Sequence, residues 1–359
     1  MDKILNKRQI RSILINLICV KLLFMYPRGL TQNSGSAAWI QVIYVSLIAL
    51  ILFSVSMKLY EKIGLKSVLA LGEELGGKPL KIIVGVFSAW IFSLCIATTV
   101  RSFPEVIKMV LLPVTPIEII LLVFGAAIVI GSRCGLVSLA KIHEIFLPVA
   151  AVIVLLFLGF LMPEINLDYI FPILGTGVKN IFLSGINALD IFGDIFALNF
   201  LFSYCKSFED AKTAGYQAIL VSSAFAVVSS FLFAATYAYP VSENFLFPFY
   251  QMARLIQIGE FFQRMEAFFE FMWSISILLY SSFYLYLICN ILRETFFLQY
   301  HEPLLIPVLS IIMSASFLAG DMREMLSNSS WVGDVIYMTA FFLPILLELC
   351  YLKKRGESD

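Results

Sequence analysis

Ten apolar runs, separated by short polar stretches, make up most of this chain of 359 residues. A helix that crosses a bilayer takes about 20 mostly apolar residues, and each run approaches or exceeds that length. The stretches between the runs are rich in glycine, proline and charged residues, which is typical of loops. The pattern predicts an all-α integral membrane protein with about ten transmembrane helices. The runs lie near residues 10–26, 37–57, 82–103, 115–132, 142–162, 181–203, 214–239, 266–292, 303–319 and 331–352.

Composition supports the same class of protein. Hydrophobic residues make up 60% of the chain and charged residues 14%, with a mean hydropathy of +0.92. Soluble domains average about 45–50% apolar and about 25% charged residues, so this chain has too much apolar surface for water. The formal net charge is +0, which provides no basic surface for nucleic acid. We therefore expect a lipid bilayer around the chain and no nucleic-acid partner.

No hydrophilic stretch is long enough for a separate domain, so the sequence predicts a single polytopic membrane domain over residues 1–359. Lysine and arginine are concentrated in the loops that share one side with the N-terminus, such as Lys58, Lys62 and Lys66 after the second run. Cytoplasmic loops carry the excess of these residues. Both termini are therefore predicted to be cytoplasmic.

Three ionisable residues stand out within the apolar runs: Lys21 in the first, and Asp190 and Asp194 in the sixth. Such a residue at a helix centre costs about 2.5–3.5 kcal/mol on insertion scales, and its presence points to function. At 1.5 Å per residue, Lys21 lies ~16 Å from the inner end of its helix and Asp190 lies ~14 Å from the outer face. Both depths are near mid-membrane. On an α-helix, Asp194 would share a face with Asp190.

The same two runs contain helix-breaking residues. The first ends in Tyr26-Pro27-Arg28-Gly29, where proline removes a backbone donor and glycine permits an unwound turn. The sixth contains Gly185 and Gly193, and Gly193 is close to half the chain away from Pro27. Paired interruptions in matching positions point to a repeat with a binding site between its halves. We expect an inverted five-plus-five repeat with broken first and sixth helices, its halves spanning about residues 8–165 and 175–355.

The broken helices predict the ligand chemistry. Backbone N–H groups freed at a half-helix end bind a carboxylate, and freed carbonyls bind an amine or a cation. The expected site is a small cavity at mid-membrane, suited to a zwitterion such as an amino acid. The residues expected to line it are Lys21, Phe24, Met25, Tyr26 and Gly29 from the first run, Thr98 from the third, Asn187, Asp190, Gly193 and Asp194 from the sixth, and Ser276 and Tyr280 from the eighth.

The role of Lys21 has several interpretations. It forms a structural ion pair with Asp190, or it contacts the bound ligand directly, or it does both. A third hypothesis is that its ammonium supplies the fixed positive charge that sodium supplies in cation-coupled relatives. Lys21, Asp190, Asp194 and Glu270, which lies one turn into the eighth run, are candidates for ion coupling or gating.

Signatures of catalysis and of metal binding are lacking. There is no HExxH, phosphate loop or serine-nucleophile motif, and the six cysteines contain no C-x-x-C pair. His143 and His301 stand alone in the sequence, without a cluster of carboxylates or cysteines around them. We expect neither an enzyme nor a bound cofactor or metal.

Several short stretches, in a particular order and spacing, resemble one family. They are residues 101–105 (RSFPE), 111–116 (LLPVTP), 135–148 (GLVSLAKIHEIFLP), 171–175 (FPILG), 192–194 (FGD), 254–273, Pro344 and the basic residues 353–355. Over residues 7–355 the chain is similar to the spore germination permease family, the membrane-embedded B subunits of nutrient germinant receptors. That family belongs to the amino acid–polyamine–organocation transporter superfamily.

One departure from the family pattern concerns the first run. Typical members carry glycines in its break, in a pattern like I-G-x-G-I-L-x-L-P. Here Val20 and Leu22 occupy those positions on either side of Lys21, and only the proline is kept, as Pro27. The break is therefore expected to be displaced towards residues 27–29, with a ligand that departs from the simplest family expectation.

The resemblance implies a receptor subunit in the spore inner membrane, with an A subunit and a C-subunit lipoprotein as partners. It would bind a small nutrient and signal germination through a conformational change. The alternative is an amino acid permease driven by protons or sodium through Asp190, Asp194 or Glu270. A more remote alternative is a structural or channel-forming subunit with a vestigial site.

Overall fold

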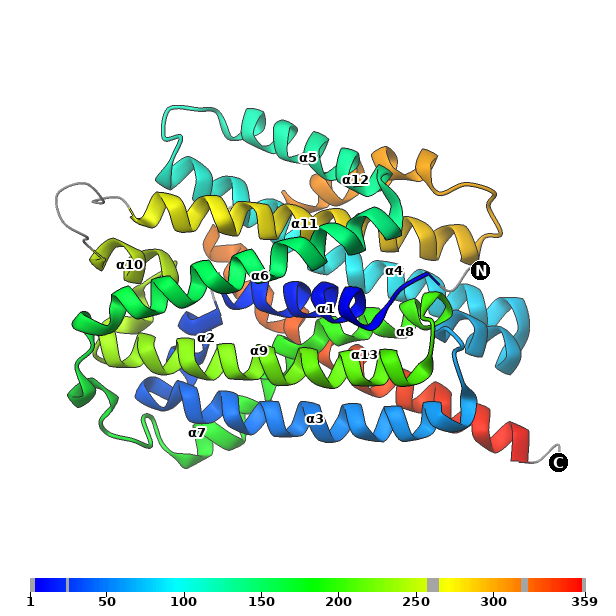
Figure 1. Ribbon diagram of the computed structural model, residues 1–359, viewed down its shortest axis with the longest axis horizontal. Coiled ribbons are helices and arrows are strands. Elements are labelled where there is room, and N and C mark those ends of the chain that lie inside the picture. The colour runs from blue at the N-terminus through cyan, green and yellow to red at the C-terminus, as the bar shows by residue number, and fades with distance from the viewer. Residues whose placement is uncertain (1–3, 24–25, 257–264, 318–321, 357–359) are drawn as a thin grey trace.

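The computed structural model describes residues 4–23, 26–256, 265–317 and 322–356, and its helices form an elongated bundle (Figure 1). Apart from one isolated bridge between Leu5 and Cys205, the described residues contain no β-structure. The α-helices are α1 (Lys7–Leu22), α2 (Tyr26–Ser34), α3 (Ala38–Ile63), α4 (Val68–Val110), α5 (Ile117–Arg133), α6 (Gly135–Leu161), α7 (Val178–Phe182), α8 (Leu198–Leu201), α9 (Phe208–Thr236), α10 (Pro248–Leu255), α11 (Met265–Thr295), α12 (Leu305–Ser316) and α13 (Met322–Gly356).

Seven segments of the described chain are long and apolar enough to cross a membrane. The all-α membrane class predicted from the sequence is thus confirmed. The remaining three predicted runs correspond to α1, α5 and α12, which have 16, 17 and 12 residues. The number of ten spans and the division into two repeats stay predictions. The seven segments are Tyr26–Ile63, Val68–Val110, Gly135–Glu164, Val178–Tyr204, Phe208–Thr236, Glu266–Thr295 and Val332–Gly356.

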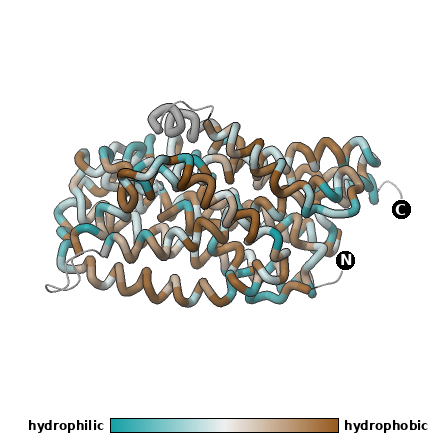
Figure 2. The backbone as a smooth tube through the Cα atoms, turned by 90° about the horizontal axis from the view of Figure 1, so that it is seen from above, coloured by the Kyte–Doolittle hydropathy of each residue, from teal (hydrophilic) through white to brown (hydrophobic). Residues whose placement is uncertain are grey.

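Large apolar side chains lie both inside the bundle and on its outer surface. Phe92, Phe283 and Tyr284 are fully buried around α11, which packs against α4, α5, α6 and α1. Leu122 on α5 and Ile145 on α6 are instead exposed, as expected for helices that face lipid. Hydrophobic residues predominate along the middle of the helices, and hydrophilic ones gather towards the two ends (Figure 2). This banding is that of a membrane protein.

The first interruption lies earlier in the chain than the sequence predicted. α1 ends at Leu22 and α2 begins at Tyr26, so Pro27 and Gly29 are helical and do not form an unwound turn. Proline is favoured at the first positions of a helix, where its missing N–H costs nothing. The displacement towards residues 27–29 is therefore wrong, and Pro27 starts the second half-helix.

The second interruption is where the sequence predicted it. Between α7 and α8, residues Ser184–Ala197 (η4) form a 3₁₀-helix of 14 residues that includes both Gly185 and Gly193. Runs of 3₁₀-helix longer than three or four residues are uncommon, and a stretch within a longer helix often marks a functional hinge. The sixth segment is therefore broken along half of its length.

Hydrogen bonds hold the outer parts of the two broken segments together. The Thr176 hydroxyl donates to the carbonyl of Asn33 at the end of α2 (2.6 Å). Gly175, at φ +47°, packs against the Ser34 carbonyl so closely that a Cβ would clash with it. Gln41 of α3 accepts from the Ser34 hydroxyl and donates to the Gly185 carbonyl (3.1 Å). The loop before α7 therefore positions η4 against α2 and α3.

The start of α1 and the end of α13 lie at the same end of the bundle (Figure 1). There, Lys66 in the loop between α3 and α4 pairs with Glu74 at 2.7 Å and donates to the Tyr351 hydroxyl of α13 at 2.9 Å. These hydrogen bonds, the one to Glu74 foremost, raise the pKa of Lys66. They join α13 to the α3–α4 loop.

Candidate ligand site

An ion pair joins the two broken segments. Lys21, one residue before the end of α1, places Nζ 2.6 Å from Oδ2 of Asp194 in η4. The same ammonium donates to the backbone carbonyl of Asp190 at 3.2 Å. The Asp194 side chain is inaccessible, whereas 19% of the Lys21 side chain is exposed. The structure thus brings Lys21 to both aspartates of the sixth segment.

The carboxylate partner of Lys21 differs from the predicted one, which was Asp190. On an α-helix, residues i and i+4 lie about 40° apart around the axis. On a 3₁₀-helix, with three residues per turn, they lie about 120° apart. Because η4 is a 3₁₀-helix, Asp190 and Asp194 point in different directions, and of the two only Asp194 forms the ion pair with Lys21.

Asp194 has a second partner on α11. The buried hydroxyl of Tyr284 donates to Oδ1 of Asp194, and its ring packs 5.2 Å from that of Phe92 on α4. Both carboxylate oxygens of Asp194 are therefore engaged. Removing one partner of such a buried pair typically costs about 3–5 kcal/mol, because the other charge remains buried.

Asp190 turns instead towards α13 and α2. A Cβ built on Gly333 of α13 would lie 2.5 Å from Oδ2 of Asp190, so a side chain there would displace the carboxylate. The buried hydroxyl of Tyr26, at the start of α2, lies beside the Asp190 carboxylate. Asp334 follows Gly333 and interacts electrostatically with Asp190. Its Oδ1 atom is buried and makes no hydrogen bond among the described residues.

Asp334 was missed from the sequence. The available signal was a carboxylate inside the last apolar run, at residues 331–352, where it looks like an interfacial charge at the end of a span. Its proximity to Asp190 depends on how α13 packs against η4, which no local pattern reveals.

Of the other predicted residues on α4 and α11, Tyr280 lies at the site, whereas Thr98 and Ser276 form hydrogen bonds within or between helices. Tyr280 is fully buried beside Asp194, and its hydroxyl makes no hydrogen bond among the described residues. Thr98 donates to the Cys95 carbonyl of its own helix (2.9 Å), whereas Thr99 is the α4 hydroxyl that lies near Tyr280. The Ser276 hydroxyl donates to Oδ1 of Asn16 on α1.

The remaining predicted residues lie further from the ion pair or have a packing role. Gly193 is buried, and a Cβ there would meet the side chain of Ile336 on α13. Asn187 and Gly29 are exposed. Glu270 is 2% exposed and lies ten residues before Tyr280, ~15 Å along α11. Phe24 and Met25 fall outside the described residues.

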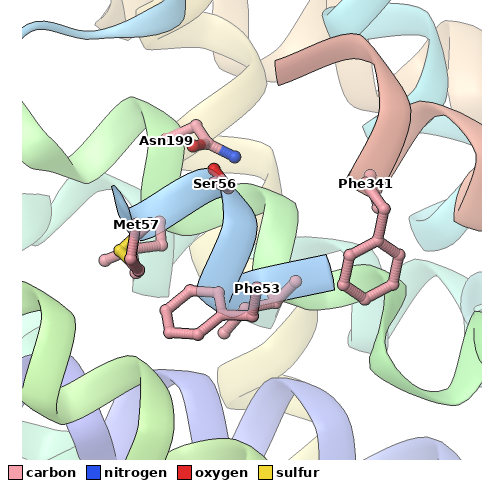
Figure 3. A pocket seen from close by; sticks show the side chains of 8 residues that line it. Phe53, Ser56, Met57, Asn199 and Phe341 are labelled. Carbon is pink, nitrogen blue, oxygen red and sulfur yellow. The ribbon is translucent and has the colours of Figure 1, made fainter. Parts of the chain in front are cut away.

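A small cavity lies further along η4, between α3, α8 and α13, and none of the predicted site residues lines it (Figure 3). Its volume is about 10 Å³, close to the space for a single water molecule. Ser56 and Asn199 place polar groups near one another on its wall, while the rings of Phe53 and Phe341 supply an apolar surface.

Behind this cavity lies a fully buried carboxylate that the sequence analysis did not single out. Ser56 donates to Oε1 of Glu348 on α13 at 2.8 Å, and Oε2 has no hydrogen-bond partner among the described residues. The hydroxyl of Tyr60, one turn from Ser56 on α3, is also buried without one. The interface of α3 with α13 therefore contains a polar cluster of its own.

The fold and the buried pair between two interrupted segments define a multi-span helical membrane protein with broken helices. Two crystal structures of manganese transporter mutants from Eremococcus coleocola have the same fold, with TM-scores of 0.56 and 0.55. Each is 14% identical to this chain and aligns with 94% of it and with 78% of the transporter. Among the described residues, no group of three His, Cys, Asp or Glu side chains is arranged to hold a metal ion.

Within this class, the family described as "Spore germination protein" matches residues 4–324, so the chain belongs to the spore germination permease family. Spore germination protein A2 of Bacillus subtilis (strain 168) is 23% identical over 360 residues, covering 98% of this chain and 96% of that protein. Spore germination protein B2 of the same organism is 19% identical over 249 residues, covering 69% and 68%. The family predicted from the sequence motifs is confirmed.

Proposed function

We propose that this protein is the membrane subunit of a spore nutrient germinant receptor. It binds a small nutrient, an amino acid, between its two interrupted segments and signals germination by a conformational change. The observation that carries this proposal is the ion pair between Lys21 and Asp194, which joins the end of α1 to η4. A ligand that binds beside this pair acts on both broken segments at once.

The backbone at the interruptions supplies the recognition groups. A half-helix that begins at the interruption leaves its first backbone N–H groups without intrahelical partners, and at α2 such groups would attract the carboxylate of an amino acid. The 3₁₀ turns of η4 and the Asp190 carboxylate attract its ammonium group. Lys21 keeps a fixed positive charge against Asp194, in place of a bound cation.

Signalling requires that the nutrient bind one arrangement of the helices more tightly than another, because equal affinity shifts no equilibrium. The long 3₁₀ stretch is the natural hinge for such a change. In this proposal the protein sits in the spore inner membrane with both termini cytoplasmic, and it passes the change to an A subunit and a C-subunit lipoprotein. The start of α1 and the end of α13 lie at one end of the bundle, which supports placing both termini on the same side of the membrane.

The second candidate is a proton- or sodium-coupled amino acid permease. The transporter fold favours it, because the solved structures that share this fold are transporters. Receptor and permease differ in whether an inner gate opens after the ligand binds.

Equilibrium binding and uptake of radiolabelled amino acids, on one preparation of the purified chain in liposomes, separate the two candidates. The variants are wild type, Asp190→Asn, and Lys141→Met as an exposed control outside the site. Saturable binding without uptake, lost in Asp190→Asn and kept in Lys141→Met, supports the receptor. Concentrative uptake that Asp190→Asn abolishes makes the protein a permease. If both variants retain binding, the site proposed around Asp190 is contradicted.

A further inference from the structure

The site contains more negative than positive side chains. Lys21 is paired with Asp194 and also interacts electrostatically with Asp190, and Asp334 is a third carboxylate that acts on Asp190. No lysine or arginine among the described residues forms an ion pair with Asp334, and its Oδ1 atom is buried without a hydrogen bond. One ammonium group thus stands against three carboxylates.

This imbalance is costly inside a membrane. Buried charges are normally paired, and an unpaired carboxylate loses its hydration without compensation. The helix α13 packs closely against Asp190, since a Cβ built on Gly333, the residue before Asp334, would lie 2.5 Å from Oδ2 of Asp190. A positively charged group between these two carboxylates would remove the imbalance.

Neighbouring tyrosines are suited to receive such a group. The Tyr280 hydroxyl is fully buried near Asp194 and Tyr26, and it makes no hydrogen bond among the described residues. The Tyr26 hydroxyl lies beside Asp190. An ammonium group has three N–H donors and no acceptor, which matches two carboxylates and a hydroxyl oxygen. Aromatic faces also attract cations.

The same observations favour an organic cation over a metal ion. The described residues contain no group of three metal-ligating side chains, whereas ammonium and guanidinium groups are bound by a pair of carboxylates with aromatic neighbours. Lys21, Asp190 and Asp334 are each half-buried.

We propose that Asp190 and Asp334 together bind the positive group of an organic cation, such as the side-chain ammonium of a basic amino acid. This inference rests on the proposed function, because it assigns the substrate class of the same site. It makes Asp334 a specificity-determining residue on α13, outside the two broken segments.

The test compares L-lysine with L-norleucine, which has the same carbon chain but lacks the terminal ammonium. Equilibrium binding of both is measured on the full-length chain in nanodiscs for wild type, Asp334→Asn and Asp334→Glu. Asp168→Asn, at an exposed carboxylate in the short 3₁₀-helix Leu167–Ile170, is the matched control. We expect wild type to prefer lysine by about tenfold or more, as a charge-assisted contact provides. The preference should vanish in Asp334→Asn and persist in Asp334→Glu and Asp168→Asn.

The outcomes separate this inference from the proposed function. Equal binding of lysine and norleucine to wild type overturns the cationic class, while the nutrient site itself stands. A lysine preference that Asp334→Asn retains overturns the role of Asp334. Failure of wild type to bind lysine, norleucine or any other standard amino acid contradicts both proposals. If Asp334→Asn does not fold, the wild-type preference and its persistence in Asp334→Glu still decide the ligand class.

Discussion

Ser276 of α11 and Asn16 of α1 bond to each other twice across their helices. The Ser276 hydroxyl donates to Oδ1 of Asn16 at 2.5 Å, and the Asn16 amide donates to the Ser276 carbonyl at 3.3 Å. Both residues are buried. This interaction fixes the half-helix that ends near Lys21, so Ser276 supports the site by positioning α1.

Ser276→Ala is expected to lower the free energy of unfolding by about 1–3 kcal/mol, because it leaves Oδ1 of Asn16 buried without its donor. The matched control is Ser274→Ala. The Ser274 hydroxyl donates only to the Glu270 carbonyl of its own helix, so we expect a smaller loss. Unfolding by titration with SDS in mixed micelles measures both. Equal losses for the two variants would contradict the anchoring role of Ser276.

Lys21→Met is expected to destabilise the protein by about 3–5 kcal/mol, because Asp194 would remain buried and charged without its cation. In the double variant Lys21→Met with Asp194→Asn, much of the stability lost in Lys21→Met should be recovered, because no unpaired charge is left. A double-mutant cycle with both single variants measures the coupling. Additive effects of the two substitutions would show that the pair contributes no coupling energy.

Much of this architecture could be predicted from the sequence, because hydrophobic length and charge are local signals. The depth of Lys21 and Asp194 in apolar runs identified both, and Gly193 marked the second break. The direction of Asp190 could not be predicted, because it depends on η4 being 3₁₀ and not α-helical. Asp334 was missed since its significance comes only from packing between α13 and η4.

Two further features could not be predicted from the sequence: the boundaries of the first break, and which of the neighbouring residues Thr98 and Thr99 faces the site. A proline breaks a helix when it lies inside it and is favoured when it lies at the start. The position of Pro27 as the second residue of α2, which begins at Tyr26, decides between these roles. On α4, a rotation of about 100° separates Thr98 from Thr99, and the sequence alone does not say which of them faces Tyr280.

Two tyrosines one turn apart on α11 should respond differently to loss of the hydroxyl. Tyr284 donates to Asp194, so Tyr284→Phe leaves a carboxylate oxygen without its donor and should cost about 1–3 kcal/mol. The Tyr280 hydroxyl makes no hydrogen bond among the described residues, so Tyr280→Phe should be neutral or slightly stabilising in the absence of ligand. Unfolding of both variants in the same micelles makes the comparison, and a larger loss for Tyr280→Phe would reject the assignment.

The cluster behind the cavity gives a further prediction. Ser56→Ala should lower the free energy of unfolding by about 1–3 kcal/mol, because the fully buried Glu348 then has no hydrogen-bond donor. Ser46→Ala, on the same helix, removes a hydroxyl that donates only to the Val42 carbonyl of α3 and should cost less. If Ser56→Ala were as mild as its control, the hydrogen bond to Glu348 would not contribute to stability.

The close approach of α4 and α11 depends on Gly85. A Cβ there would collide with the hydroxyl of Thr295 and would lie 2.9 Å from its Cβ, so the helices themselves must move apart. Gly85→Ala should therefore cost about 1–3 kcal/mol as an overpacked contact, even though alanine is the better helix former by about 1 kcal/mol. Gly159→Ala on α6 has nothing within 4 Å of the added Cβ and should be neutral or stabilising. Opposite signs for these two glycines, measured as unfolding free energies, would establish that packing between the helices and not helix propensity determines the effect at Gly85.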